Sequence, residues 1–376
     1  MIWHSICHSL TPFCRPTTAP ARQVAACLEP MGCGVLLLWS LLALAREGRA
    51  LQRHDWAPRV PASDDKAVRS LLEEGGAPFV VTDALSVDAC EAWCDALLAS
   101  LGDVTVKRQR RGAEPTAMAL GDFFLDALAS SHEAPSFLFD EELLDGRGDL
   151  RDFVVAPQRA VFGGEESWLD LFPAARRPAD ACVVGAGAGA RSPLHRDPYD
   201  WTGTSLCVEG SKVWRFLLDV DDDALDAYAL ASDAFGDSDS AGTQSDGDLY
   251  AERVGSAWPP PEAYADDETL AETWAAPDRF APSPPVPAGS RLVTALQRAG
   301  DVVVVPPRSW HQTYALEPSL AVASQVCCRR DAKNVFAHVL HHAAPDRTRD
   351  DEARLLRAAE TDDPAAAVRA LFAYLR

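Results

Sequence analysis

Two side chains near the middle of this 376-residue chain, those of His195 and Asp197, have the types and spacing of metal ligands. On an extended strand, alternate side chains point to the same face, so the imidazole and the carboxylate would lie side by side. They supply two of the three ligands of a 2-His-1-carboxylate site, which suits Fe(II) and leaves coordination positions open. His311 is the best third ligand, because it follows the buried-type strand Val302–Val305 and the stop signal Pro306. The pattern therefore predicts an iron site assembled from two distant parts of the chain.

A lysine flanked by aromatic residues is the second unusual feature. In the predicted strand at 212–218, Lys212, Trp214 and Phe216 alternate and would share one face. Such a lysine either extends its ammonium past the apolar surface into water or lies inside the protein and pairs with an anion. The residues by themselves leave both interpretations open.

Three blocks of sequence carry a resemblance to a known family. They are His195-Arg196-Asp197-Pro198, Gly210-Ser211-Lys212-Val213-Trp214, and the stretch from Gly300-Asp301 through Pro306 to Trp310-His311. In this order and spacing they resemble the JmjC family of Fe(II)/2-oxoglutarate oxygenases, which belongs to the cupin-like proteins. The resemblance covers about residues 182–328, apart from an insertion. The family usually has an asparagine four residues after the distal histidine, where this chain has Ala315.

The resemblance implies both the fold and the metal site. The fold would be mainly β with helical additions, built around a double-stranded β-helix, the jelly-roll barrel of cupin-like proteins. His195, Asp197 and His311 would be the catalytic residues that hold Fe(II), with molecular oxygen as a substrate. The implied activity is that of a 2-oxoglutarate-dependent dioxygenase, a hydroxylase of a protein or peptide side chain rather than a demethylase.

The resemblance also implies which residues hold the cosubstrate 2-oxoglutarate. Lys212 would pair with its distal carboxylate, a charge-assisted contact. Ser192 and Ser205 match polar positions that help to hold the cosubstrate in the family, and Trp214 would lie beside Lys212 in the same pocket. Two alternatives stay open: a cupin-like binding module without turnover, and a cupin enzyme of different chemistry that uses another divalent metal.

The charge of the chain is strongly acidic and unevenly distributed. The net charge is −21, and residues 219–280 contain 17 Asp and Glu side chains but only two Arg. Nucleic acid and anionic membranes need a basic face, so neither is expected as a general partner. The run at 221–290 is also rich in Ser, Gly and Pro, which predicts a long acidic insertion between two strands of the barrel.

An apolar run from Met31 to Ala45 has the length of the hydrophobic region of a signal peptide and is too short for a stable membrane span. It favours the secretory pathway or the endoplasmic reticulum. The alternative is a cytoplasmic protein in which the run forms a buried helix. We interpret residues 1–60 as a targeting segment of low structure.

The remaining chain divides into three predicted parts. Residues 61–180 are predicted as a helical cover of the catalytic domain, and residues 181–330 as the barrel with its insertion. Residues 331–376 are predicted as C-terminal helices, which would either pack on their own barrel or mediate a homodimer. The six cysteines beyond residue 60 have no zinc-binding spacing and predict no disulfide framework.

Local signals predict individual elements within these parts. Cap residues and glycine stops predict helices at 64–76 and 87–101. The basic run at 107–111 is interpreted as a solvated turn, and the glycine-rich run at 185–190 as a flexible lip. Residues 206–218, with Gly210 between two strand-like runs, predict a β-hairpin.

Overall fold

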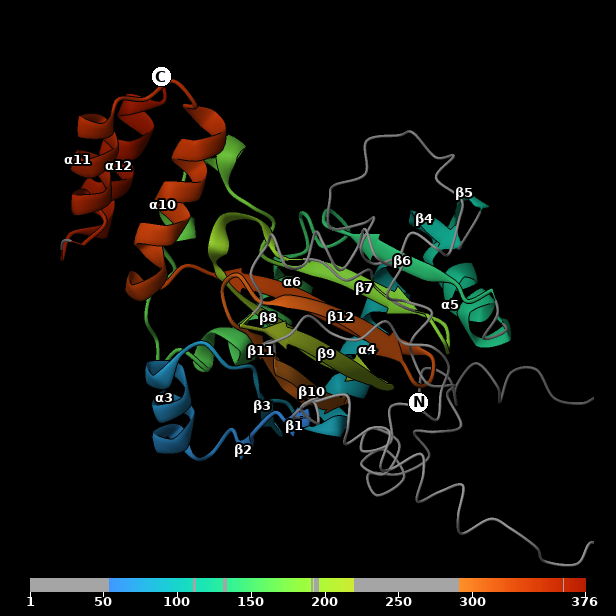
Figure 1. Ribbon diagram of the computed structural model, residues 1–376. Coiled ribbons are helices and arrows are strands. Elements are labelled where there is room, and N and C mark those ends of the chain that lie inside the picture. Colours follow the sequence, from blue (N-terminus) through green and yellow to red (C-terminus); the bar gives the residue numbers. More distant parts are fainter. Residues whose placement is uncertain are drawn as a thin grey trace, which may run out of the picture. The chain divides into compact units, whose positions relative to one another are not determined.

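The structure of the protein, a computed structural model, describes residues 54–110, 113–130, 134–190, 192, 196–219, 291–360 and 362–376. The apolar run at 31–45, the acidic insertion at 221–290 and the predicted ligand His195 lie outside the described residues. The described part is mainly β-sheet with helices added to it, as the sequence predicted (Figure 1).

The described strands form two sheets. In spatial order the larger sheet contains β2 (Arg59–Pro61), β3 (Phe79–Thr82), β11 (Val302–Val305), β8 (Thr202–Glu209), β13 (Ser319–Val326), β7 (Cys182–Ala186), β6 (Phe137–Asp140), β4 (Thr105–Arg110) and β5 (Ala113–Ala119). The smaller sheet contains β1 (His54–Trp56), β10 (Arg291–Arg298), β9 (Ser211–Leu218) and β12 (Trp310–Ala315). From β8 onward the chain passes back and forth between the sheets, since β8, β11 and β13 belong to the larger one and β9, β10 and β12 to the smaller one.

The predicted hairpin at 206–218 has the right strands but the wrong pairing. β8 and β9 follow one another, yet Gly210 turns the chain from the larger sheet into the smaller one. β8 is hydrogen-bonded to β11 on one side and β13 on the other, so it has no free edge for β9. Gly210 has a φ of +73°, and a Cβ there would lie 2.2 Å from the carbonyl oxygen of Pro318, so this crossing requires glycine.

The predicted helical cover contributes strands as well as helices. β1 and β2 begin before its predicted start at residue 61, so the described fold already includes His54. Strands β3 to β6 belong to the larger sheet. Two predicted helices are confirmed, with Asp64 and Ser86 as their N-caps. The helices of this part are α3 (Asp65–Glu74), α4 (Val87–Leu101), α5 (Leu120–Ala129) and α6 (Gly148–Ala160), with the short 3-10 helices η1 (Trp168–Leu171) and η2 (Ala174–Arg176).

The described part of the basic run, residues 107–110, lies in β4 and not in the predicted turn. Arg108 and Arg110 extend from β4 and both form ion pairs with Asp126 on α5. Burial alone would raise the pKa of Asp126, but hydrogen bonds from Ser136 and Arg108 and the charges of both arginines hold this pKa below its ordinary value. The positive charges are therefore compensated across an interface and do not interrupt the strand.

The two sheets pack on each other through an apolar core. Trp214, Phe216 and Leu218 of β9 lie in one buried cluster with strands of the opposite sheet. The other members of this cluster are Ala57, Val80, Val293, Ala295, Val303 and Val305. Burial of each large side chain contributes on the order of 1.5–3 kcal/mol, so the cluster fixes which face of β9 points into the protein.

The C-terminal part forms three helices: α10 (Arg329–Ala343), α11 (Arg349–Ala358) and α12 (Pro364–Tyr374). Asp363 caps α12 by accepting a hydrogen bond from the backbone N–H of Ala366. The three helices share a core with η1 that includes Trp168, Phe336 and Leu371. They therefore pack against their own chain, and the homodimer stays a prediction.

Two further findings apply to the described residues. None of their helices combines the length and the apolar character that a membrane span requires. All six of their cysteines are buried and unbridged.

Candidate functional site

Three of the predicted site residues, Lys212, Trp214 and His311, lie on the inner face of the smaller sheet. β9 lies between β10 and β12, and residues paired across antiparallel strands point to the same side. Along this face Lys212 is paired with Gln297 and Ala315, Trp214 with Ala295 and Thr313, and Phe216 with Val293 and His311. Lys212, Trp214 and Phe216 therefore share the inner face, as the alternation in the sequence predicted, and His311 lies on this face four positions from Lys212 along β9.

A backbone carbonyl holds the imidazole of His311 at Nδ1. Its side chain is 4% exposed, and its Nδ1 lies 3.0 Å from the carbonyl oxygen of Ser309. A carbonyl only accepts hydrogen bonds, so Nδ1 carries a proton and donates it to Ser309. The imidazole ring lies 5.8 Å from the ring of Trp214 and 5.9 Å from that of Phe216, centroid to centroid. An imidazole that is held through Nδ1 and is neutral can bind a metal ion through Nε2.

The carboxylate of Asp197 meets this imidazole from another part of the chain. Its Oδ1 lies 3.8 Å from Nε2 of His311. The carboxylate rests on Gly203 of β8, where a Cβ would lie only 2.7 Å from Oδ2 and 3.2 Å from Cβ of Val305. Glycine at 203 is therefore what gives Asp197 room beside His311.

Two contacts join the loop that carries Asp197 to the beginning of β12 and the turn before it. The guanidinium of Arg196 lies 5.3 Å from the centroid of the Trp310 ring, a cation–π geometry. Asp200 and Arg308 form an ion pair at 3.8 Å, and both have a positive φ, of 53° and 61°. Non-glycine residues adopt this conformation at a cost of on the order of 1–3 kcal/mol and are concentrated at functional sites.

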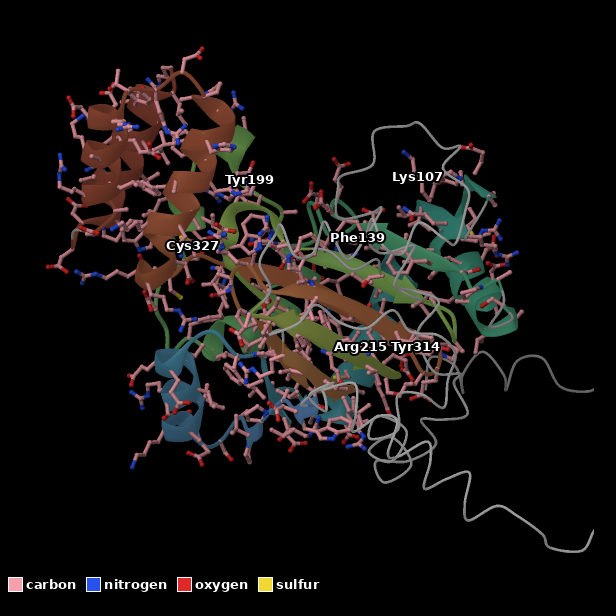
Figure 2. All side chains as sticks on the ribbon, viewed as in Figure 1. Lys107, Phe139, Tyr199, Arg215, Tyr314 and Cys327 are labelled. Atoms are coloured by element: carbon pink, nitrogen blue, oxygen red, sulfur yellow. The ribbon has the colours of Figure 1, made fainter. Side chains whose placement is uncertain are left out.

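Tyr199 lies in the short 3-10 turn η3 (Pro198–Asp200) that follows Asp197 and also has a positive φ, of 65°. Its ring stacks on Trp201 at 5.3 Å and lies 5.2 Å from the imidazole of His338 on α10. Figure 2 shows Tyr199 between the sheets and this helix. His338 thus has an aromatic partner and helps to attach α10 to the loop after Asp197.

Lys212 is buried, 4% exposed. Burial lowers the pKa of its ammonium. The nearest ionisable neighbour is the thiol of Cys207, but burial raises the pKa of that thiol to about 12, so it is neutral at pH 7. Within the described residues no carboxylate pairs with the ammonium. Of the two interpretations that the sequence left open, the structure supports the inward lysine.

The two predicted serines lie on either side of this interior. Ser205 of β8 is buried on the inner face of the larger sheet. Ser192 lies beside β12, where its Oγ accepts hydrogen bonds from the backbone N–H of Thr313 at 2.8 Å and from the hydroxyl of Thr313 at 3.0 Å. The glycine-rich run before it is not the predicted flexible lip, because Gly189 and Ala190 are hydrogen-bonded to Ala315 along the same strand.

The sequence missed two residues of this site. Gly203 makes room for Asp197, and Gln297 forms a hydrogen bond with the indole of Trp214. Neither has a spacing or motif that marks it, because each acts on a residue distant in sequence. Among the described residues, no group of three or more His, Cys, Asp or Glu side chains gathers as metal ligands would. The predicted set would need His195, which lies outside the described residues.

Comparisons with known proteins leave the family open. No protein-family model matches this chain, and no curated protein matches its sequence.

Proposed function

We propose that this protein is an Fe(II)- and 2-oxoglutarate-dependent dioxygenase of the JmjC type, which hydroxylates a side chain of a protein or peptide. The observation that carries the proposal is that Asp197 and His311 meet in the same interior that contains the buried Lys212. A buried lysine is rare unless an anion accompanies it. Its presence beside a pair of metal ligands favours a metal that works together with an anionic cosubstrate.

The strand order supports a double-stranded β-helix as the finer description of the fold. The larger sheet runs β11-β8-β13-β7 at its centre, and the smaller sheet runs β10-β9-β12. The pairings among these central strands are antiparallel, and a chain that passes repeatedly between two such groups of strands winds as a jelly roll does. Gly189, Ala190 and Ser192 are hydrogen-bonded to residues of β12 and would mark the beginning of the remaining strand of the smaller sheet.

The residues that are described fit a divalent metal. Nε2 of His311 and Oδ1 of Asp197 are 3.8 Å apart, a gap that two bonds of about 2.0–2.2 Å, the range known for zinc, can span. The hydrogen bond to Ser309 is made by Nδ1, so Nε2 would be the atom of His311 that binds the metal. His195 would complete the set, and Fe(II) held by the three residues would supply the chemistry that transfers an oxygen atom from O2 to a C–H bond.

Lys212 and Ser192 would hold 2-oxoglutarate. Four positions separate Lys212 from Phe216, the partner of His311, which is about 13 Å of backbone at 3.3 Å per residue. The long lysine side chain shortens this gap, so a short dicarboxylate bound near His311 would reach the ammonium. Ser192 accepts two hydrogen bonds from Thr313 and keeps its own hydroxyl proton to donate to a carboxylate. Ser205 would add a second polar contact from the larger sheet.

Trp214 and Phe216 would keep water away from the reacting groups. Both are buried, their rings are 5.9 Å apart and nearly parallel at 7°, and both lie against the imidazole of His311. In an interior that excludes water, the attraction between an ammonium and a carboxylate is much stronger than in solvent. The same apolar wall would protect a reactive centre from side reactions.

A cupin enzyme that uses another divalent metal is the second candidate. One observation favours it: Ala315 stands where the JmjC family usually has an asparagine. Imidazole and carboxylate ligands also accept manganese, cobalt or zinc, and Lys212 would then bind a different anion. A binding module without turnover would keep the metal and show no reaction.

The test is metal analysis combined with a 2-oxoglutarate turnover assay on the full chain. We expect one Fe(II) per chain and release of succinate, with Mn(II) and Co(II) as inert substitutes. Asp197→Ala and His311→Ala should each abolish both iron binding and turnover. His341→Ala, which changes an exposed histidine on α10, is the control and should retain both.

Three results would decide against the proposal. Stoichiometric iron in the Asp197→Ala/His311→Ala double variant would show that the metal lies elsewhere. Tight binding of another metal without succinate release would favour the second candidate. Iron and 2-oxoglutarate bound without turnover, in the presence of O2 and a range of peptides, would favour the binding module.

A further inference from the structure

Gln297 is a completely buried polar side chain that faces the candidate site. It lies on β10, and its exposed fraction is 0%. Its Oε1 accepts a hydrogen bond from the indole N–H of Trp214 at 2.8 Å. Its Nε2 donates to the carbonyl oxygens of Ser205 and Asp301 at 2.6 and 3.1 Å. An indole N–H can only donate and a carbonyl can only accept, so these three partners allow one orientation of the amide.

The partners of Gln297 tie the two sheets together at this point. Trp214 belongs to the smaller sheet, Ser205 to the larger sheet, and Asp301 to the turn before β11. Asp301 is itself held by Arg59, whose Nη2 lies 2.9 Å from its carboxylate. The amide of Gln297 is thus anchored to the larger sheet and can hold the indole in a fixed place.

The indole of Trp214 in turn limits the orientation of the His311 imidazole. Its ring is nearly parallel to that of Phe216, and the imidazole of His311 lies against both at 5.8 and 5.9 Å with interplanar angles of 31° and 33°. The backbone carbonyl of Ser309 holds the imidazole at Nδ1, and a tilt of the ring about that hydrogen bond would move it against the two aromatic rings. The aromatic wall restricts this tilt, and the position of the wall depends on Gln297.

We propose that Gln297 is a positioning residue that sets the orientation of the His311 imidazole toward a bound metal by holding Trp214 through its indole N–H. This inference rests on the proposed function, since it assigns His311 to a metal. Gln297 does not touch the metal or the cosubstrate in this role. It acts through one intermediate ring, as residues behind metal ligands do when they orient them.

The chain offers a matched control for this role. Gln158 on α6 is also completely buried, and its Nε2 donates to the carbonyl oxygen of Val154. Gln158→Met and Gln297→Met make the same chemical change, and both remove hydrogen bonds from a buried site. A general loss of stability would affect both variants, whereas an effect on the metal is expected only for Gln297→Met.

The experiment is a titration of the full chain with Co(II), which is followed by the visible ligand-field spectrum of the metal. We expect Gln297→Met to weaken Co(II) binding by about 10- to 100-fold, the range seen for residues that orient metal ligands, and to change the spectrum. Gln158→Met should keep the affinity and the spectrum of the wild type. Trp214→Phe keeps a ring against His311 but lacks the indole N–H, and it should shift the spectrum in the same direction.

A double-mutant cycle tests the route through Trp214. If Gln297 acts through the indole, Gln297→Met should have little further effect in the Trp214→Phe background. Wild-type affinity and spectrum in Gln297→Met, or in Trp214→Phe if the first variant does not fold, would overturn the inference while leaving the proposed metal site in place. A wild-type chain that binds no Co(II) would overturn the proposed function and this inference with it.

Discussion

Lys212 is the residue whose surroundings depart most from what its chemistry favours in isolation. It is a charged side chain at 4% exposure with two aromatic neighbours on its own face, and burial lowers the pKa of its ammonium. A charge taken out of water without a partner destabilises the folded state. This cost is justified if the ammonium has a partner during function, and the proposed cosubstrate provides one.

Replacement of Lys212 by methionine should therefore separate stability from binding. At pH 7 we expect Lys212→Met to be more stable than the wild type without cosubstrate, and to bind 2-oxoglutarate more weakly by roughly 2–5 kcal/mol. Since the folded-state pKa lies below the unfolded value of about 10.4, the unfolded state binds more protons between the two values. The wild type should therefore gain stability relative to the variant as the pH rises through this window.

Urea denaturation at pH 7 and pH 10 and an anaerobic titration with 2-oxoglutarate would measure both effects. Lys333→Met is the control, because this lysine on α10 is exposed and pairs with Glu360 at the surface. It should change neither quantity appreciably. A Lys212→Met variant that is less stable at pH 7 would mean that the ammonium already has a partner in the resting protein.

At the scale of elements, strand β8 supports the site from behind. It lies in the middle of the larger sheet, hydrogen-bonded on both edges, and is buried along nearly its whole length. Gly203 in this strand is the position over which the carboxylate of Asp197 lies. A glycine in a strand interior weakens the strand and often marks a close approach of another group, which is the case here.

Gly203→Ala should accordingly damage the site more than the fold. The added methyl group would lie 2.7 Å from Oδ2 of Asp197 and 3.2 Å from Cβ of Val305, so the carboxylate must move. We expect a stability loss of about 1–3 kcal/mol, as for other overpacked sites, together with the loss of metal binding. Thermal denaturation and metal analysis would measure the two effects.

Gly148→Ala provides the matched comparison. A Cβ at this first residue of α6 would meet no atom within 4 Å, and alanine should be neutral or stabilise the helix by about 0.5–1 kcal/mol. Unchanged metal content in Gly203→Ala would show that Asp197 does not depend on the space above this glycine.

At the scale of the whole molecule, the C-terminal helices belong to the same folded unit as the sheets. Their core includes Trp168 of η1 and Trp201, which directly precedes β8. Asp331 near the start of α10 accepts a hydrogen bond from Thr202 of β8 at 2.9 Å. The helices are therefore attached to the strand that carries Gly203, and their packing should contribute to the stability of the site.

Leu371→Ala tests this attachment. Leu371 on α12 is completely buried in the shared core, and the substitution should lower the free energy of unfolding by about 2–5 kcal/mol. Arg369→Ala on the exposed side of the same helix should lie within about 0.5 kcal/mol of the wild type. If both variants unfold at the same urea concentration, the C-terminal helices are not part of the cooperative unit.

The sequence by itself predicted the parts of this protein that depend on near neighbours along the chain. Asp64 and Ser86 capped the expected helices because an N-cap needs only a side-chain oxygen and the next turn of backbone. Alternation predicted that Lys212, Trp214 and Phe216 share a face. The larger proposal, with His195 as a ligand and a jelly-roll barrel as the fold, rests on a resemblance between motifs.

Only the tertiary structure decided which strands meet. The hairpin expected around Gly210 became a crossing between two sheets, because β8 already has neighbours on both of its edges. The roles of Gly203 and Gln297 arise from contacts with Asp197 and Trp214, residues that lie elsewhere in the sequence. Strand pairing and the packing of two faces depend on which surfaces can be buried together, and no local pattern of residue types contains that information.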